Sequence, residues 1–297
     1  MTGRPATAAT TGRVSLYLVK EGTACSKKTG LPAPFEGGTA ERRGGRSMKF
    51  VRYQKAGETS WGMLEGDVIS ALAGAPWVTR EPTGEQTLIG EVSLLPPAEP
   101  GNIFCVGLNY ADHAEESGTP MPEEPNIFLK GVNSLLGHEG TIIIPAWPGR
   151  VDYEGEMAVV IGKRCRDVPE EEARDVIFGL TCLNDVTARD LTKKDARLTR
   201  SKSFDTFCPM GPWLVDSRDA GGRKIETRLN GKVVQSSNTD AMGFPATRII
   251  ALISRFATLS PGDVIATGTP AGVGPLGPGN VVEVEIEEVG TLRNYCA

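Results

Sequence analysis

Two glutamates one residue apart, Glu154 and Glu156, are the residues of this chain that most clearly point to metal chemistry. The apolar, β-branched run at 157–161 that follows them predicts a buried strand, on which residues two apart share a face. Neighbouring carboxylates repel each other and raise each other's pKa unless a cation lies between them. A third acid, Asp185, lies downstream in an Asn-Asp-Val-Thr-Ala-Arg-Asp run. The three acids together predict a site for a divalent metal.

Ligation by oxygen alone predicts a hard ion, Mg²⁺ or Mn²⁺, with coordination positions left open. Zinc fits poorly because it prefers nitrogen and sulfur ligands in four-coordinate sites. The alternative for the paired glutamates is the solvated edge of a strand. Spacing alone favours that alternative, because charged residues are mostly exposed.

The chain has only two histidines, His113 and His138, so any histidine-dependent chemistry must use one of them. His113 and Glu116 lie three apart in a stretch predicted to be a short helix capped by Asn109, and they share a face of it. Such a pair can activate water and then deliver a proton. The alternative is a surface salt bridge worth only about 0.2–0.5 kcal/mol. His138 lies among glycines and is predicted to be a turn residue.

Composition limits the classes of function. The 297 residues are 39% hydrophobic, which suits a globular protein with a substantial core. Thirty-two basic residues against 37 acidic ones give a net charge of −5, which argues against nucleic acid as a partner. Six scattered cysteines without a Cys-x-x-Cys pair argue against a zinc site or a disulfide framework. No apolar stretch has the length of a membrane span and the N-terminus lacks signal-peptide order, so we expect a cytoplasmic protein.

The elements that must position these residues follow from periodicity and turn signals. Residues 1–47 are predicted to be a mostly disordered leader, and 48–97 a small antiparallel β domain. A proline-rich linker around 96–101 precedes the main domain, 101–297. Helices are predicted at 169–178 and 245–257, and a hairpin at the Asn-Gly pair 230–231. The proline-rich stretch 118–125 could be a mobile loop over a site. The sum is an α+β chain dominated by β.

Five ordered motifs resemble those of the fumarylacetoacetate hydrolase superfamily, over residues 101–297. They are Gly107-Leu108-Asn109-Tyr110 with His113 and Glu116, then Glu154-x-Glu156, Asp185 to Asp190, Ser201 to Asp205, and Gly262 to Pro270. The resemblance implies a mixed β-sandwich roll, a homodimer, bound Mg²⁺ or Mn²⁺, and a small anionic 2-oxo acid as substrate. The 48–97 unit is similar to the small N-terminal β domain of bacterial members.

The resemblance also implies roles for individual residues, and it favours the metal interpretation over the strand edge. Metal ligands would be Glu154, Glu156 and Asp185, and the acid–base pair would be His113 and Glu116. Lys202 would lie beside the substrate and stabilise a developing oxyanion, although an ordinary solvated basic run is the alternative. Arg189, Tyr110 and Thr269 would be contacts in the substrate pocket.

The sequence departs from the family pattern at two positions. A substrate-holding glutamine is common three residues after Arg189, but this chain has Thr192 there. Fumarylacetoacetate hydrolase itself has a fourth acidic ligand seven residues before its histidine, where this chain has Val106. The first departure leaves the identity of the substrate open. The second suggests that water or substrate oxygens complete the metal shell.

The predicted activity is metal-dependent hydrolysis of a C–C bond in a β-diketo acid, an acylpyruvate such as fumarylpyruvate, giving pyruvate and a carboxylic acid. The alternative is a decarboxylase or isomerase of related 2-oxo or 2-hydroxydienoic acids. A third possibility is a metal-binding protein without turnover. A Gly-x-Gly-x-x-Gly spelling at 272–277 is not expected to bind a dinucleotide, because Pro275 and Pro278 prevent the helix that would hold the pyrophosphate.

Overall fold

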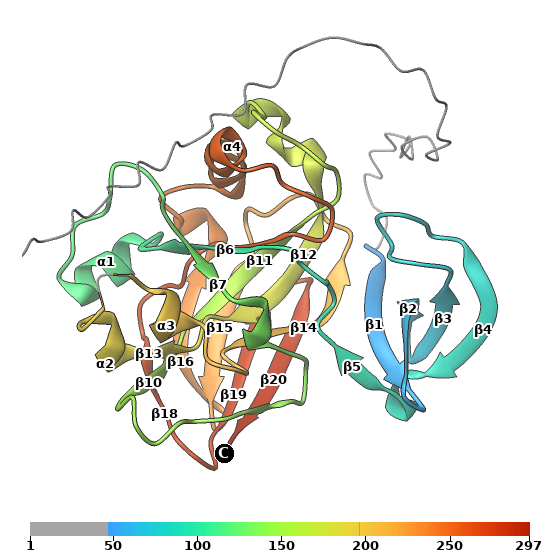
Figure 1. Cartoon of the computed structure of the whole chain (residues 1–297), viewed down its shortest axis with the longest axis horizontal. Coiled ribbons are helices and arrows are strands. Elements are labelled where there is room, and N and C mark those ends of the chain that lie inside the picture. The colour runs from blue at the N-terminus through green and yellow to red at the C-terminus, as the bar shows by residue number, and fades with distance from the viewer. Residues whose placement is uncertain (1–46, 196) are drawn as a thin grey trace, which may run out of the picture. The chain divides into compact units, whose positions relative to one another are not determined.

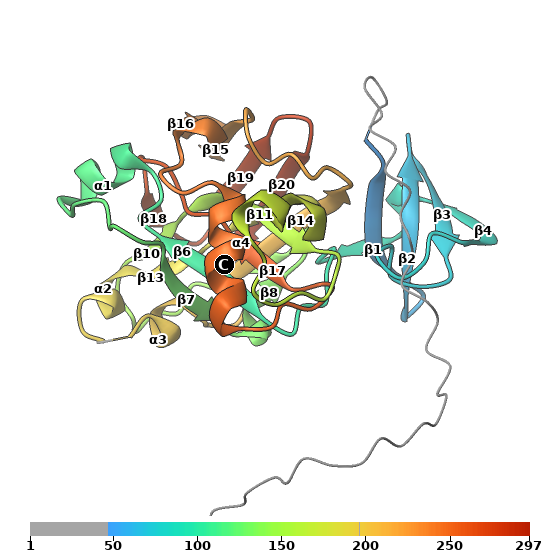
Figure 2. The same cartoon turned by 90° about the horizontal axis from the view of Figure 1, so that it is seen from above.

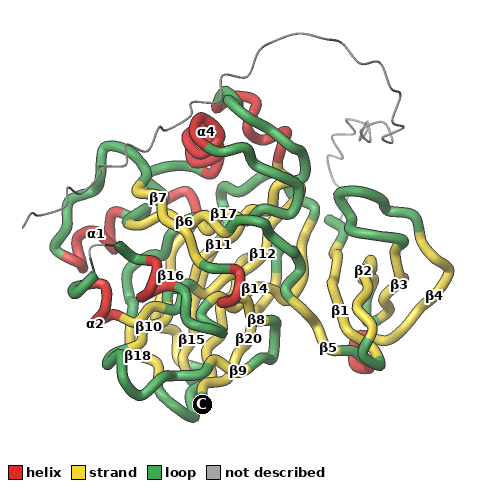
Figure 3. The backbone as a smooth tube through the Cα atoms, viewed as in Figure 1, coloured by secondary structure: helices red, strands yellow, loops and turns green. Residues whose placement is uncertain are grey.

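The computed structural model describes residues 47–195 and 197–297 (Figure 1). The predicted leader therefore lies outside the described residues, except for Ser47. Strands predominate in the described part (Figure 3), as an α+β chain dominated by β requires. The fold class predicted from the sequence is confirmed.

The strands form three sheets. The twelve-stranded sheet contains β1 (Lys49–Lys55), β2 (Glu58–Glu65), β3 (Val68–Leu72), β4 (Pro82–Leu88), β5 (Ser93–Leu95), β6 (Ile103–Gly107), β7 (Asn126–Lys130), β8 (Leu135–Leu136), β11 (Gly155–Ile161), β12 (Ile177–Asn184), β14 (Cys208–Val215) and β17 (Val264–Ala266). The three-stranded sheet contains β10 (Val151–Tyr153), β13 (Thr187–Ala188) and β18 (Gly274–Leu276). The five-stranded sheet contains β9 (Thr141–Ile142), β15 (Lys224–Leu229), β16 (Lys232–Asn238), β19 (Val281–Ile286) and β20 (Gly290–Cys296).

The helices are short. The α-helices are α1 (Ala111–Ser117), α2 (Arg189–Thr192), α3 (Thr199–Lys202) and α4 (Ala246–Phe256), and the 3₁₀ helices are η1 (Ile89–Glu91), η2 (Val132–Ser134), η3 (Glu170–Val176) and η4 (Thr239–Ala241). In both cartoon views α1, α2 and α3 lie at the end of the domain that carries β10, β13 and β18 (Figures 1 and 2). The three helices carry His113, Glu116, Arg189 and Lys202, four of the predicted site residues.

Central strand β11 explains how the sheets pack. Met157, Val159 and Ile161 on one face join a core cluster with Ile225 and Val284 of the five-stranded sheet. Ala158 and Val160 on the other face join a second cluster with Phe50 of β1. Because both faces are covered, the strand is a continuous apolar run rather than an alternating one.

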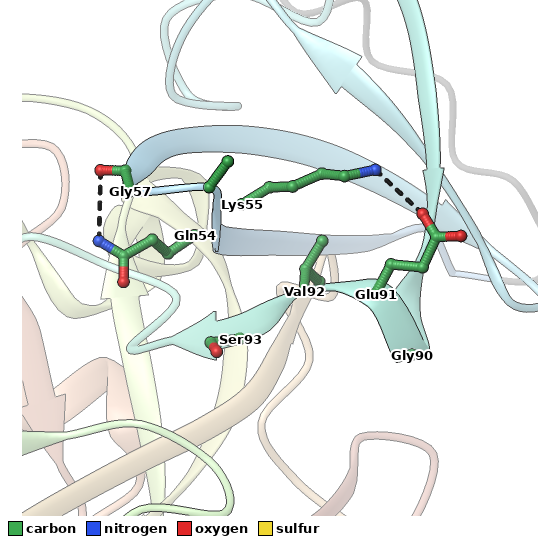
Figure 4. Close-up of a pocket in the computed structure, with 8 residues that line it drawn as sticks. Gln54, Lys55, Gly57, Gly90, Glu91, Val92 and Ser93 are labelled. Atoms are coloured by element: carbon green, nitrogen blue, oxygen red, sulfur yellow. Dashed lines mark hydrogen bonds and ion pairs between the residues drawn. The ribbon is translucent and has the colours of Figure 1, made fainter.

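The strands β1 to β4 pair in antiparallel order, as predicted for residues 48–97. β1 also pairs with β14, so these strands continue the large sheet. A hollow of about 390 Å³ lies between the β1–β2 turn and η1. Figure 4 shows its lining, in which Lys55 points to Glu91 and forms an exposed ion pair. The hollow contains none of the predicted site residues.

Two helix predictions have different outcomes. Helix α4 is confirmed, with Ile249, Ile250 and Ile253 buried, but Phe256 is 58% exposed and does not belong to the buried side. The helix predicted at 169–178 is present, but its type and its end differ from the prediction. A 3₁₀ helix, η3, ends at Val176, and the buried strand β12 begins immediately after it. Within the described residues, no helix is long and apolar enough to cross a membrane.

Candidate active site

The two glutamates lie where the chain leaves one sheet and enters another. β10 ends at Tyr153 and β11 begins at Gly155, so Glu154 stands between them, and Glu156 is the second residue of β11. Asp185 follows the end of β12, and its backbone N–H donates to the Glu154 carbonyl at 2.8 Å. One oxygen from each of the three carboxylates lies within 4.8 Å of the others, and all three residues are buried. Burial excludes the solvated strand edge considered from the sequence.

Two buried lysines contact this acidic triad. Lys202 Nζ donates to Glu154 Oε2 at 2.7 Å and to Asp185 Oδ2 at 2.6 Å. Lys130 Nζ donates to Asp185 Oδ1 at 2.6 Å and to the Val186 carbonyl at 3.1 Å. Since the Lys202 side chain is 6% exposed, the solvated basic run is not its environment.

The cations affect the acids unequally. Burial raises the pKa of Glu154, but Lys202 and Arg189 outweigh burial and bring that pKa down to about 2. Burial and the charges of Asp185 and Glu154 hold the pKa of Glu156 well above its usual value, against Lys202 and the Gly268 N–H. Glu156 therefore lacks sufficient positive charge from the protein. The oxygen donors and this imbalance fit a hard divalent cation bound between the carboxylates.

Arg189 reaches the triad from the start of α2. Its Nε donates to Asp152 Oδ2 at 2.7 Å, and its Nη2 donates to Glu154 Oε1. Asp152 is completely buried and also accepts from Arg150 Nε at 2.6 Å. The guanidinium is thus fixed by two carboxylates, while 26% of the side chain remains exposed to meet an anionic ligand.

His113 and Glu116 form the expected i,i+3 pair on α1, with Nδ1 and Oε2 3.3 Å apart. The Glu116 carboxylate also accepts the Gly272 N–H, at 3.1 Å from each oxygen. The Gly272 carbonyl accepts from the Tyr153 hydroxyl at 2.9 Å. The glycine-rich loop thus holds the carboxylate that orients the imidazole, and His113 is one of the charges that lower the pKa of Glu154.

Asn109 does not cap α1, contrary to the sequence prediction. Its side chain donates to the carbonyls of Phe244 and Thr267, at 3.0 and 2.7 Å, and accepts the Phe244 N–H at 2.8 Å. The residue at the N-cap is Tyr110. The side chain therefore joins three distant segments beneath the helix, because it is fully buried and must satisfy its polar atoms there.

Tyr110 is fully buried, and its hydroxyl has no hydrogen-bond partner among the described residues. Burial and the charges of Glu156 and Asp112 raise the pKa of this phenol, so it remains a proton donor. The Tyr110 hydroxyl is a buried donor without a partner among the described residues, and the charge of Glu156 affects its pKa. Such a donor is suited to binding a ligand oxygen near the triad. This geometry supports the pocket role that the resemblance implies for Tyr110.

The two threonines use their hydroxyls within the protein. Thr269 donates to the Gly155 carbonyl and accepts from Gln235 Nε2, both at 2.8 Å, so a substrate contact would have to use its backbone. Thr192 donates to the Arg189 carbonyl at 2.7 Å and so helps to close the short helix α2.

His138 lies in a turn, as predicted, and its Nδ1 accepts the Arg293 N–H at 3.1 Å.

Sequence reasoning missed Lys130, Asp152 and Gln235. Lys130 directly follows the apolar run Ile127 to Leu129 and is the one buried residue of its strand, and a lysine that ends an apolar run was the available signal. Asp152 immediately precedes the Tyr-Glu-Gly-Glu run, but nothing in the sequence shows that Arg189 reaches it. Gln235 lies 80 residues from Gly155, whose N–H it accepts, and only the pairing of strands could identify it.

Replacing Lys130 with alanine should lower the free energy of unfolding by about 3 kcal/mol, because Asp185 Oδ1 and the Val186 carbonyl both lose this buried donor while Asp185 keeps Lys202. Urea denaturation measures the change. Lys193→Ala, at an exposed position after α2, serves as the matched control and should change stability by less than about 0.5 kcal/mol. Equal effects of the two substitutions would contradict the structural role of Lys130.

Comparisons with known proteins match this geometry. Residues 102–296 match the family model described as fumarylacetoacetate hydrolase C-terminal, and residues 48–97 match the model described as Rv2993c-like, N-terminal. Human oxaloacetate tautomerase FAHD2B is 40% identical over 258 residues, which cover 82% of this chain and 78% of the relative.

Two solved structures are similar over 84% of this chain and 99% of their own. One is 5-carboxymethyl-2-hydroxymuconate delta-isomerase from Mycobacterium smegmatis, with a TM-score of 0.80 and 38% identity. The other is maleylpyruvate hydrolase from Sphingobium sp. SYK-6 in complex with manganese(II) and pyruvate, with a TM-score of 0.69 and 30% identity. The site geometry, the motifs and these matches agree, and the chain belongs to the fumarylacetoacetate hydrolase superfamily.

Proposed function

We propose that this enzyme binds Mg²⁺ or Mn²⁺ through Glu154, Glu156 and Asp185 and acts on a small anionic 2-oxo acid. The buried acidic triad is the observation that carries this proposal. Three buried carboxylates face two buried lysines, so a divalent cation would reverse the local charge and favour an anion. When bound, the ion would act as a Lewis acid that polarises the 2-oxo carbonyl of the substrate.

Hydrolysis of an acylpyruvate uses the remaining groups of the site. His113, oriented by Glu116, removes a proton from water as the water oxygen attacks the acyl carbonyl. The C–C bond then breaks, and its electron pair remains on the carbon that becomes the methyl group of pyruvate. The proton held by His113 returns to that carbon. We assign the stabilisation of developing negative charge on substrate oxygens to Lys202 and the Tyr110 hydroxyl, and the buried ammonium beside Glu154 and the absence of a partner for the phenol among the described residues support this assignment.

The second candidate is tautomerisation or isomerisation of a 2-oxo diacid, with decarboxylation as a related outcome. This second candidate is as well supported by the comparisons as hydrolysis is. The tautomerase and isomerase relatives are 40% and 38% identical to this chain, and the hydrolase is 30% identical. These reactions would use the same proton transfers at the carbon beside the 2-oxo group but no attacking water. The product therefore separates the two candidates.

A substrate panel tests the proposal. Acylpyruvates and oxaloacetate are incubated with the enzyme and Mg²⁺ or Mn²⁺, and the products are identified by chromatography and ultraviolet absorbance. We expect pyruvate plus a second carboxylic acid for hydrolysis, an absorbance change without a mass change for tautomerisation, and CO₂ for decarboxylation. EDTA should abolish turnover and added metal should restore it.

Turnover that persists after exhaustive metal removal would overturn the metal-dependent mechanism. Bound metal without turnover of any member of the panel would instead favour the third possibility, a metal-binding protein without activity.

A further inference from the structure

We infer that Gln235 is a positioning residue that fixes the peptide between the two metal-binding glutamates. The inference rests on the proposed metal site. Gln235 lies on β16 of the five-stranded sheet, whereas Glu156 lies on β11 of the large sheet. The side chain of Gln235 is buried, with 2% of the residue exposed.

Gln235 closes a ring of hydrogen bonds around Gly155. The Gly155 N–H donates to Gln235 Oε1 at 3.0 Å, and Gln235 Nε2 donates to Thr269 Oγ1 at 2.8 Å. Thr269 Oγ1 completes the ring by donating to the Gly155 carbonyl at 2.8 Å. The second N–H of Gln235 can reach the Pro270 carbonyl, 2.8 Å from Nε2. Both polar groups of Gly155 are therefore held from outside the strand.

The ring acts where a small rotation would matter most. Gly155 contributes one peptide group toward Glu154 and one toward Glu156, so its backbone torsions set the separation of the two carboxylates. A Cβ on Gly155 would clash with the Thr227 hydroxyl and approach Gln235 Oε1 to 3.2 Å. Side chains of the five-stranded sheet thus pack directly against the backbone of Gly155. Gly155 provides no side chain of its own to limit rotation, and the hydrogen-bonded ring supplies that restraint.

Thr227 provides a matched control on the same sheet. It is as buried as Gln235, it also lies against Gly155, and its hydroxyl has no hydrogen-bond partner in the described part of the chain. Thr227→Val removes that hydroxyl at nearly constant volume. Gln235→Leu has a similar volume and removes the two hydrogen bonds of the ring that Gln235 makes, as well as the one to the Pro270 carbonyl. The two variants separate loss of the ring from a general disturbance of this sheet.

The experiment measures Mn²⁺ binding to the full chain by electron paramagnetic resonance and the melting temperature by circular dichroism. We expect Gln235→Leu to weaken Mn²⁺ binding at least about tenfold, the range found for residues that orient metal ligands. The resonance spectrum of the bound ion should also change. Thr227→Val should keep the dissociation constant of the wild type. Gln235→Glu retains the acceptor for the Gly155 N–H but not the donors, and it should weaken binding less than Gln235→Leu.

The outcomes are distinct. If the wild type binds no Mn²⁺, the proposed function fails. If it binds Mn²⁺ and Gln235→Leu binds equally well with an unchanged spectrum, the inference about Gln235 is overturned and the proposed function stands. If Gln235→Leu does not fold, Gln235→Glu decides, and wild-type affinity and spectrum in that variant would overturn the inference. A lower melting temperature with unchanged binding in a folded Gln235 variant would show a merely structural role for Gln235.

Discussion

Replacing Glu156 with glutamine should weaken Mn²⁺ binding by at least about 100-fold, since loss of a ligand should cost at least as much as loss of a residue that orients one. The same substitution should raise stability in the presence of EDTA. Glu156 is a buried acid whose pKa is raised by burial and by the charges of Asp185 and Glu154, so its charged form is unfavourable without a cation. The distinctive expectation is that Glu156→Gln weakens Mn²⁺ binding and at the same time stabilises the metal-free protein.

Mn²⁺ titration and urea denaturation in EDTA measure the two effects. Glu171→Gln, on the exposed side of η3, is the control and should change neither. If Glu156→Gln kept wild-type Mn²⁺ affinity, Glu156 would not be a ligand. If it destabilised the protein in EDTA, the account of an electrostatically strained acid would be wrong.

Replacing His113 with glutamine should lower the rate of acylpyruvate hydrolysis by about 10²–10⁴-fold, the usual contribution of a general acid–base group. Metal affinity should change little, because His113 contacts Glu116 and no hydrogen bond joins it to the triad among the described residues. Pyruvate release under saturating Mn²⁺ measures the rate. The matched variant is His138→Gln, which alters the other histidine of the chain in a turn bonded to Arg293.

Equal rates for the His113 and His138 variants would contradict the proposed role of His113 in activating water. Retained tautomerisation together with lost hydrolysis in His113→Gln would show that tautomerisation does not need proton transfer by His113. Glu116→Gln is expected to have a smaller effect, because glutamine can still accept the Gly272 N–H and hold the loop against α1.

Local signals predicted part of the fold well. The buried strand predicted at 157–161 is confirmed as part of β11, and the antiparallel strands predicted within 48–97 are present, because both have clear local signals. Asn230 and Gly231 both adopt positive φ, as the Asn-Gly hairpin signal requires. Strands β12 and β14 were not predicted, because β12 begins within the helix predicted at 169–178 and β14 contains Pro209, Gly211 and Pro212, residues that usually interrupt a strand.

The acidic triad was predictable from the sequence because two of its members are two residues apart and the third lies in a recognisable motif. The chemistry of carboxylates then restricts the ion to a hard divalent cation. The tertiary structure alone decided which cations and dipoles surround these acids. Lys130 and Gln235 reach the site from strands far away in the chain, and Asp152 is joined to it by Arg189, 37 residues away; strand pairing rather than local sequence determines where such residues meet. The sequence by itself therefore identified the three acids, and folding determined the charges and hydrogen bonds around them.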